Sequence, residues 1–228
     1  VVQTHVSSAM EVTPETKKAV RRLLDAGWAV TNQEVFTVAA SRRGHSAKLR
    51  KVLNDIGVLP YYNFSVKGFK ENRELFSTNA RSTQEQVEES SIGQIAQRYH
   101  ATIRTFMKDA QNMVEQIDSI RQGDEIPFIS PDRNTLNLPG VGKSNTYRTI
   151  GITEDGRRIL RFEFDHTRPH SKVIEDMGFV IVIESKSIAR YLDQLSEMGE
   201  NVSEYDTIWG YSAGSLEPRS PVFEGTTK

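Results

Sequence analysis

A glycine-rich segment that ends in a lysine is the part of the sequence best suited to chemistry. Residues 138–144 read Leu-Pro-Gly-Val-Gly-Lys-Ser, and the lysine is Lys143. A phosphate-binding P-loop requires a glycine five residues before Gly142 and a helix directly after the lysine. The earlier position is Asn137, and residues 145–153 have the pattern of a strand. The sequence therefore disfavours a nucleotide-binding P-loop.

Two other interpretations of this segment stay open on local grounds. It is either a plain glycine-rich turn with an exposed lysine, or a tight turn that holds Lys143 rigidly beside a phosphate-bearing cofactor. Pyridoxal phosphate requires such a lysine, because a Schiff base forms from an uncharged amine at a fixed place.

Further polar residues are expected at the carboxyl ends of parallel strands, which point into the mouth of a βα barrel. Lys67 directly follows a predicted strand over residues 58–66. A group made of Lys67, Asn137 and Lys143 would be cationic and would suit a carboxylate ligand. The alternative is that Lys67 is a solvated loop lysine. Comparable strand ends are predicted at His5, Asn32, Gln33 and Asn137.

Two other polar segments are weaker candidates. Residues 165–170 contain Asp165, His166 and His170, but their spacing is not that of a zinc site, so a polar loop is the better interpretation. Residues 41–45 form a small basic turn with Arg42 and Arg43. This turn could hold an anion, although a solvated helix start is the simpler reading.

The elements that would position these residues alternate between strand and helix. Strands are predicted over residues 1–6, 28–31 and 58–66, and helices over residues 13–27 and 45–56. A long helical pattern over residues 84–121 changes phase near Gly93, which suggests two helices. Strand–helix–strand units at this spacing predict right-handed crossovers and a parallel sheet.

The predicted fold class is α/β, in two domains. Residues 1–144 would form a partial, half βα barrel, because a closed barrel needs about 250 residues. Residues 145–228 would form a small α+β domain with a hairpin around Asp155-Gly156, a helix over residues 187–198 and an irregular tail that contains Trp209. Within this domain, the apolar residues 179–183 predict a buried strand.

Composition excludes several classes of protein. The 228 residues include 29 Lys and Arg against 30 Asp and Glu, so no basic field exists to attract nucleic acid. The sequence contains no cysteine, which excludes disulfides and cysteine-held metal clusters within this chain. Apolar runs are too short to span a bilayer, and the first residues do not form a signal peptide. We therefore expect a cytoplasmic protein without nucleic-acid or membrane partners.

Several segments, taken together, resemble the lysine 2,3-aminomutase family of radical S-adenosylmethionine, pyridoxal-phosphate enzymes. They lie between residue 1 and about residue 165 and occur in the family's order. The matching segments are Gln3-Thr4-His5 with Glu11-Val12-Thr13, Ala26-Gly27 with Asn32-Gln33-Glu34-Val35, Pro60-Tyr61-Tyr62, and Pro139-Gly140-Val141-Gly142-Lys143.

This resemblance implies roles for individual residues. The lysine that closes the Pro-Gly segment of the family binds pyridoxal phosphate covalently, which implies that role for Lys143. The histidine of the Thr-His pair and the glutamine of the Asn-Gln pair lie beside S-adenosylmethionine, which implies His5 and Gln33. The family's three-cysteine motif for a 4Fe-4S cluster is absent, as it belongs to the half of the barrel that this chain lacks.

A departure from the family concerns the substrate. Lysine-specific members bind the side-chain ammonium with two aspartates, and the corresponding positions here are Lys67 and Asn137. A lysine would repel an ammonium and attract a carboxylate, so the pair favours an acidic amino acid. The Lys and Asn pair is similar to that of glutamate 2,3-aminomutases.

The sequence thus predicts the C-terminal portion of a 2,3-aminomutase that moves the amino group of glutamate from the α- to the β-carbon. The parent polypeptide would be an isomerase, and this chain alone would be inactive. Its expected partners are a small amino-acid substrate and further copies in a homo-oligomer. The alternatives are a non-catalytic assembly or binding module, or a related aminomutase with another substrate.

Overall fold

The computed structural model describes residues 1–66, 71, 73–93, 100–106, 108–129, 135–138, 145–164 and 172–213. The chain divides into two compact units, each made of segments that are separate in the sequence. Unit 1 contains Val1–Val35, Gly44–Asn63 and Glu88–Arg133, and unit 2 contains Phe36–Arg43, Phe64–Val87 and Asn134–Lys228. The domain boundary at residue 144 stays a prediction.

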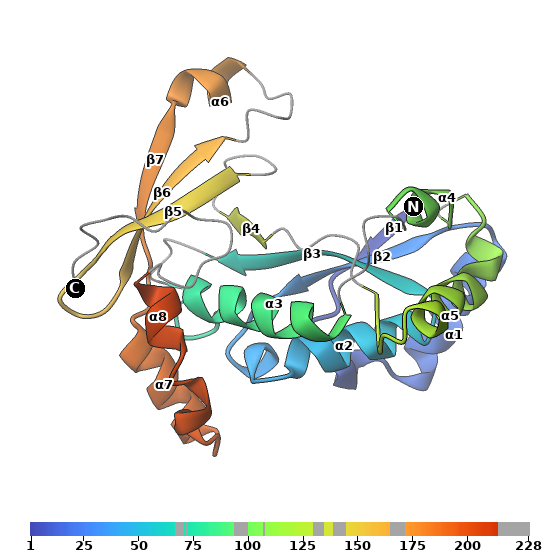
Figure 1. Ribbon diagram of the computed structural model, residues 1–228, viewed down its shortest axis with the longest axis horizontal. Coiled ribbons are helices and arrows are strands. Elements are labelled where there is room, and N and C mark those ends of the chain that lie inside the picture. Colours follow the sequence, from blue (N-terminus) through green and yellow to red (C-terminus); the bar gives the residue numbers. More distant parts are fainter. Residues whose placement is uncertain are drawn as a thin grey trace. The chain divides into compact units, whose positions relative to one another are not determined.

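Two separate sheets make the fold a mixed α/β structure (Figure 1). The four-stranded sheet has the order β1-β2-β3-β4 and contains the parallel pair β1 and β2. The three-stranded sheet is antiparallel in the order β5-β6-β7. The α/β class is confirmed, and the half barrel stays a prediction. The strands are β1 (Val2–Thr4), β2 (Val30–Val35), β3 (Val58–Val66), β4 (Thr135–Leu138), β5 (Asn145–Ile152), β6 (Arg158–Phe164) and β7 (Phe179–Ile183).

Helices α1, α2 and α5 of unit 1 lie along one face of strands β1 and β2 (Figure 1). The start of α1 follows its sequence signals, because the Thr13 hydroxyl accepts a hydrogen bond from the Thr16 amide at 3.3 Å and proline occupies the first turn. The unit 1 helices are η1 (Ala9–Glu11), α1 (Pro14–Asp25), α2 (His45–Asn54), α4 (His100–Phe106), η5 (Ala110–Asn112) and α5 (Met113–Gly123).

The core of unit 1 is an apolar cluster between these helices and the strands. Buried side chains from every one of its layers contribute, and their removal from water is the main force that holds the layers together. The cluster contains Val20, Leu24, Ala29, Val30, Leu49, Leu53, Val58, Leu59, Ile103, Phe106, Ala110, Met113, Ile117, Ile120 and Ile129.

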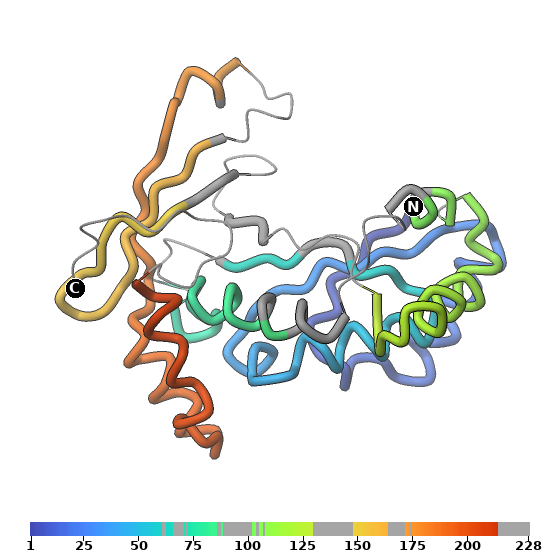
Figure 2. Tube along the Cα trace, viewed as in Figure 1, coloured from blue at the N-terminus to red at the C-terminus, as the bar shows by residue number. Residues whose placement is uncertain are grey.

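Unit 2 has its own apolar core, built mainly by its C-terminal helices. These helices are drawn in orange to red in Figure 2, where α7 and α8 lie side by side. The core contains Val38, Ala80, Ile188, Tyr191, Leu195, Tyr205, Ile208 and Tyr211. The helices placed within unit 2 are η2 (Ala39–Ser41), α6 (Lys172–Met177), α7 (Ile188–Glu197), η6 (Val202–Tyr205) and α8 (Ile208–Ser212).

Within the described residues, the long helical pattern over residues 84–121 falls in α3, α4, η5 and α5, so the prediction of two helices was wrong. The first, α3 (Asn79–Gly93), starts five residues earlier than expected. The Thr78 hydroxyl accepts a hydrogen bond from the Arg81 amide at 3.3 Å, which gives α3 a polar start that the apolar periodicity did not reveal.

The apolar strand β7 is not buried as predicted. Phe179, Ile181 and Ile183 are 51%, 44% and 45% exposed, and only the alternate residues Val180 and Val182 are half-buried. A run of five apolar residues has no alternation, so its sequence cannot indicate that one face is open to solvent. The predicted irregular tail was also wrong in part, because Trp209 lies in α8.

Candidate functional site

Two predicted site residues, His5 and Gln33, directly follow the last residue pair of the parallel register of β1 and β2. The parallel register pairs Thr4 with Asn32, and His5 and Gln33 are the residues that directly follow this pair in the sequence. His5 is exposed and Gln33 is half-buried. Gln33 lies inside β2 and not at its end, because β2 continues to Val35, beyond the predicted strand.

Asn32 has a structural role at this place. Its side-chain oxygen accepts hydrogen bonds from the Thr4 hydroxyl at 2.9 Å and from the Val6 amide at 2.8 Å. Its side-chain nitrogen donates to the Val6 carbonyl at 2.8 Å. Two of these bonds hold the backbone of Val6 and the third holds the side chain of Thr4, so Asn32 ties together the residues on both sides of His5. A buried amide with this many partners is satisfied by the fold itself.

A buried polar layer lies between the strands and α2 in unit 1, which sequence reasoning missed. The Ser46 hydroxyl donates to the Glu34 carboxylate, and the Arg50 guanidinium donates to the Asn63 side-chain oxygen at 3.0 Å. All four side chains are buried. Buried charges persist only where partners replace water. The alternation along β2 was the sequence signal that could have revealed this buried layer. It puts Asn32 and Glu34 on one face of the strand and Gln33 on the other.

The remaining predicted site residues lie in β4 or outside the described residues. Lys67, Lys143 and residues 165–170 lie outside the described residues. Asn137 lies in β4, the strand that ends the four-stranded sheet next to β3. Their proximity to one another therefore stays a prediction.

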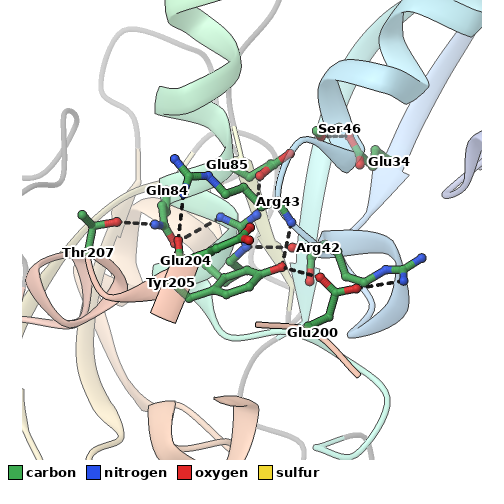
Figure 3. Close-up of polar contacts among 12 residues, drawn as sticks. Glu34, Arg42, Arg43, Ser46, Gln84, Glu85, Glu200, Glu204, Tyr205 and Thr207 are labelled. Atoms are coloured by element: carbon green, nitrogen blue, oxygen red, sulfur yellow. Dashed lines mark hydrogen bonds and ion pairs between the residues drawn. The ribbon is translucent and has the colours of Figure 1, made fainter. Parts of the chain in front are cut away.

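The basic turn of residues 41–45 leads into α2, which begins at His45, and Arg43 is exposed, as expected of a solvated helix start. In unit 2, the Arg42 guanidinium forms an ion pair with Glu200 at 3.0 Å, and the Arg43 guanidinium donates to the Glu204 carbonyl at 3.1 Å (Figure 3). The Arg43 amide donates to the Tyr205 hydroxyl at 2.9 Å. Both arginines are thus used by contacts within the protein.

One surface pocket of unit 1 lies away from the predicted residues. It has a volume of about 650 Å³, and its lining includes Arg121, which pairs with Asp55 at 2.8 Å and Asp118 at 3.1 Å. Within the described part of the chain, no group of three or more histidine, aspartate or glutamate side chains is placed to hold a metal ion. Among the same residues, no helix combines the length and apolar character needed to cross a membrane.

The residues differ in how well they suit the cofactors that the resemblance implies. An iron–sulfur cluster is held by cysteine thiolates, and this chain has none, so it does not hold the cluster. His5 and Gln33 are polar side chains that directly follow the last register pair of β1 and β2, which is compatible with a polar ligand such as S-adenosylmethionine. Lys143 lies outside the described residues, so its surroundings do not test pyridoxal phosphate.

Comparison with known proteins gives one informative match. The chain is 31% identical over 215 residues to an uncharacterized KamA family protein of Methanocaldococcus jannaschii. The match covers 92% of this chain and 28% of that protein, so the chain spans only a minor part of its relative. The similarity supports the KamA family. No family model matches the chain, and no solved structure matches it.

Proposed function

We propose that this chain is the C-terminal portion of a radical S-adenosylmethionine, pyridoxal-phosphate-dependent 2,3-aminomutase that acts on glutamate. The observation that carries the proposal is the set of motif segments, which occur in one order and end at Lys143. The similarity to a KamA family protein over 92% of the chain supports the same class. We further propose that the parent protein is a cytoplasmic homo-oligomer.

The charge of two residues supports glutamate as the substrate. Lys67 and Asn137 stand where lysine-specific enzymes have aspartates. Lys67 would bind the distal carboxylate, and Asn137 would donate a hydrogen bond to it. A lysine substrate would bring a second ammonium to Lys67, and this repulsion disfavours binding.

The chain's residues would act by binding and orientation. When bound, pyridoxal phosphate would hold the migrating amino nitrogen, and S-adenosylmethionine would supply the radical chemistry that the cluster initiates. Lys143 would anchor pyridoxal phosphate covalently. His5 and Gln33 would contact S-adenosylmethionine, and Asn32 would fix the backbone around His5 through its bonds to Thr4 and Val6.

The substrate test compares glutamate with lysine in the full-length enzyme, reconstituted with its cluster and both cofactors. We expect kcat/KM for glutamate to exceed that for lysine by at least about a hundredfold, since a like-charge contact replaces an ion pair. In the Lys67→Asp variant, glutamate turnover should fall severely. A preference of the unmodified enzyme for lysine would refute the assignment of glutamate while leaving the enzyme class intact.

A non-catalytic assembly module is the second candidate, and two observations favour it. The chain contains no cysteine, and β7 exposes Phe179, Ile181 and Ile183 on one face. An exposed apolar sheet face is typical of a surface that contacts another protein. Pyridoxal phosphate bound covalently to Lys143 in the full-length protein would argue against this candidate.

A further inference from the structure

One arginine at the start of α3 joins three segments of unit 2. Arg81 is fully buried, and its Nε donates to the Ser41 carbonyl at 2.7 Å. Its Nη1 donates to the Gln84 side-chain oxygen at 3.1 Å, and its Nη2 pairs with the Glu85 carboxylate. The guanidinium lies 5.0 Å from the centre of the Tyr205 ring. A single side chain thus contacts η2, its own helix and η6.

A second layer of bonds reinforces the same junction. The hydroxyls of Tyr191 and Ser41 lie 3.1 Å apart, and the Tyr205 hydroxyl accepts from the Arg43 amide at 2.9 Å. Burial raises the pKa of both tyrosines, so these hydroxyls keep their protons over the physiological range. Gln84 donates to Thr207 (Figure 3). The segment Phe36–Arg43 and the start of α3 are therefore bonded to α7, η6 and α8.

Both of these attached segments follow strands of the four-stranded sheet. Phe36–Arg43 begins at the residue after β2, and α3 is the first described helix after β3. In βα folds, the segments that follow the carboxyl ends of parallel strands carry the ligand-binding groups. A displacement of about 1 Å in such groups lowers the rate by up to about a hundredfold. Their anchoring therefore bears on function.

We propose that Arg81 is a positioning residue: it fixes Phe36–Arg43 and the start of α3 to the C-terminal helices. It thereby sets the geometry of the segments that follow the carboxyl ends of β2 and β3, which we call the substrate edge. The planar guanidinium is required, because it reaches the Ser41 carbonyl and the Glu85 carboxylate in different directions while it lies over the Tyr205 ring. The kinetic part of this inference rests on the proposed function.

The test compares Arg81→Lys with Arg158→Lys in the full-length enzyme. Arg158 is also fully buried in unit 2, but its side chain donates to Thr149 within the β5–β6 hairpin. It therefore controls for the general effect of shortening a buried arginine. The Arg81→Lys substitution keeps the positive charge but removes the branched guanidinium with its several N–H donors. The anchoring should therefore loosen while the fold persists.

The first readout is hydrogen exchange, which does not depend on activity. The amides of Phe36 and Val38 donate to the carbonyls of Phe64 and Leu75, both at 2.9 Å. We expect Arg81→Lys to speed exchange of these amides by about tenfold, and Arg158→Lys to leave them within about twofold. Unchanged exchange in Arg81→Lys, or equal acceleration in both variants, would overturn the anchoring role.

The second readout is steady-state kinetics with glutamate. We expect Arg81→Lys to raise KM by about tenfold while covalent pyridoxal phosphate loading stays complete, and Arg158→Lys to leave KM unchanged. An unchanged KM in Arg81→Lys, alongside faster exchange, would overturn the link to the substrate edge. Failure of the unmodified enzyme to load pyridoxal phosphate would refute the proposed function instead, and the exchange result would still decide the anchoring.

Discussion

The adjacent residues Asn32 and Gln33 of β2 have different roles. Asn32 is buried and holds the backbone around His5, whereas Gln33 is half-buried beside His5 and is proposed to face the cofactor. The two side chains differ by one methylene, so the contrast between them comes from their positions on the strand. Substituting each of them separates structural support from ligand contact.

We predict that Asn32→Ala lowers the free energy of unfolding by about 2 kcal/mol, because three part-buried hydrogen bonds to Thr4 and Val6 are lost. Gln33→Ala should lower it by less than about 1 kcal/mol and should instead weaken S-adenosylmethionine binding in the full-length enzyme. Urea denaturation measures the first effect and equilibrium binding the second. A reversed order of stabilities would contradict these assignments.

Lys186 makes the stability of unit 2 depend on pH. It is 3% exposed, and burial lowers the pKa of its ammonium from 10.5 to about 8, against the opposing attraction of Glu74. The unfolded chain therefore binds more protons than the folded chain between pH 8 and pH 10.5, so this residue makes stability rise with pH across that window.

We predict that Lys186→Met removes this rise and increases stability most at neutral pH, where the buried ammonium is charged. Lys48→Met is the matched control, because Lys48 is exposed on α2. Urea denaturation midpoints at a series of pH values measure the effect as a difference between each variant and the unmodified chain. If Lys186→Met keeps the full slope, the buried lysine is not its source.

At the scale of elements, two glycines end helix-to-strand turns with the same backbone and different surroundings. Gly27 and Gly57 have φ values of +81° and +80°. A Cβ at Gly27 would meet nothing within 4 Å, whereas one at Gly57 would lie 2.7 Å from Leu24 Cδ1 and 3.1 Å from Val114 Cγ2. Only at Gly57 do core side chains of unit 1 leave no room for a Cβ.

We predict that Gly27→Ala costs about 1 kcal/mol from the left-handed backbone, and that Gly57→Ala costs at least about 1 kcal/mol more from overpacking. Thermal or urea unfolding of the two variants measures the difference. Equal losses would mean that the neighbours of Gly57 move aside without strain.

The elements also show what the sequence could predict. Local signals sufficed for α1, whose cap is Thr13, for β3 and for the hairpin whose turn contains Gly156 at φ +76°. Tertiary context decided the rest. Nothing local to residues 179–183 indicates which face of β7 is covered, and α8 is a short helix whose Ile208 and Tyr211 join a core built elsewhere.

The same distinction holds for the candidate site. Strand spacing predicted both His5 and Gln33 at strand ends, whereas Gln33 lies inside β2, which continues to Val35. Contact of either residue with a cofactor stays a prediction. The bonds of Asn32 could not be predicted, since the bond to Val6 joins residues 26 positions apart. The same holds for Arg81, whose bond to Ser41 spans 40 positions. Such contacts depend on the three-dimensional arrangement and leave no periodic trace in the sequence.

At the scale of the whole molecule, the chain accounts for part of an enzyme. It matches 28% of its archaeal relative and contains no cysteine. We predict that this chain alone, supplied with iron, sulfide and S-adenosylmethionine under reducing conditions, forms no 4Fe-4S cluster and releases no 5′-deoxyadenosine. Chromatography of the products is the measurement. Release of 5′-deoxyadenosine by the chain alone would contradict the division of labour proposed here.

Covalent binding of pyridoxal phosphate to the amine of Lys143 can be measured directly. The full-length protein is loaded with the cofactor, reduced with borohydride and digested, and the modified peptide is located by mass spectrometry. We predict a single phosphopyridoxyl group on Lys143 that is absent from Lys143→Ala. A label on another lysine, or no label at all, would contradict it.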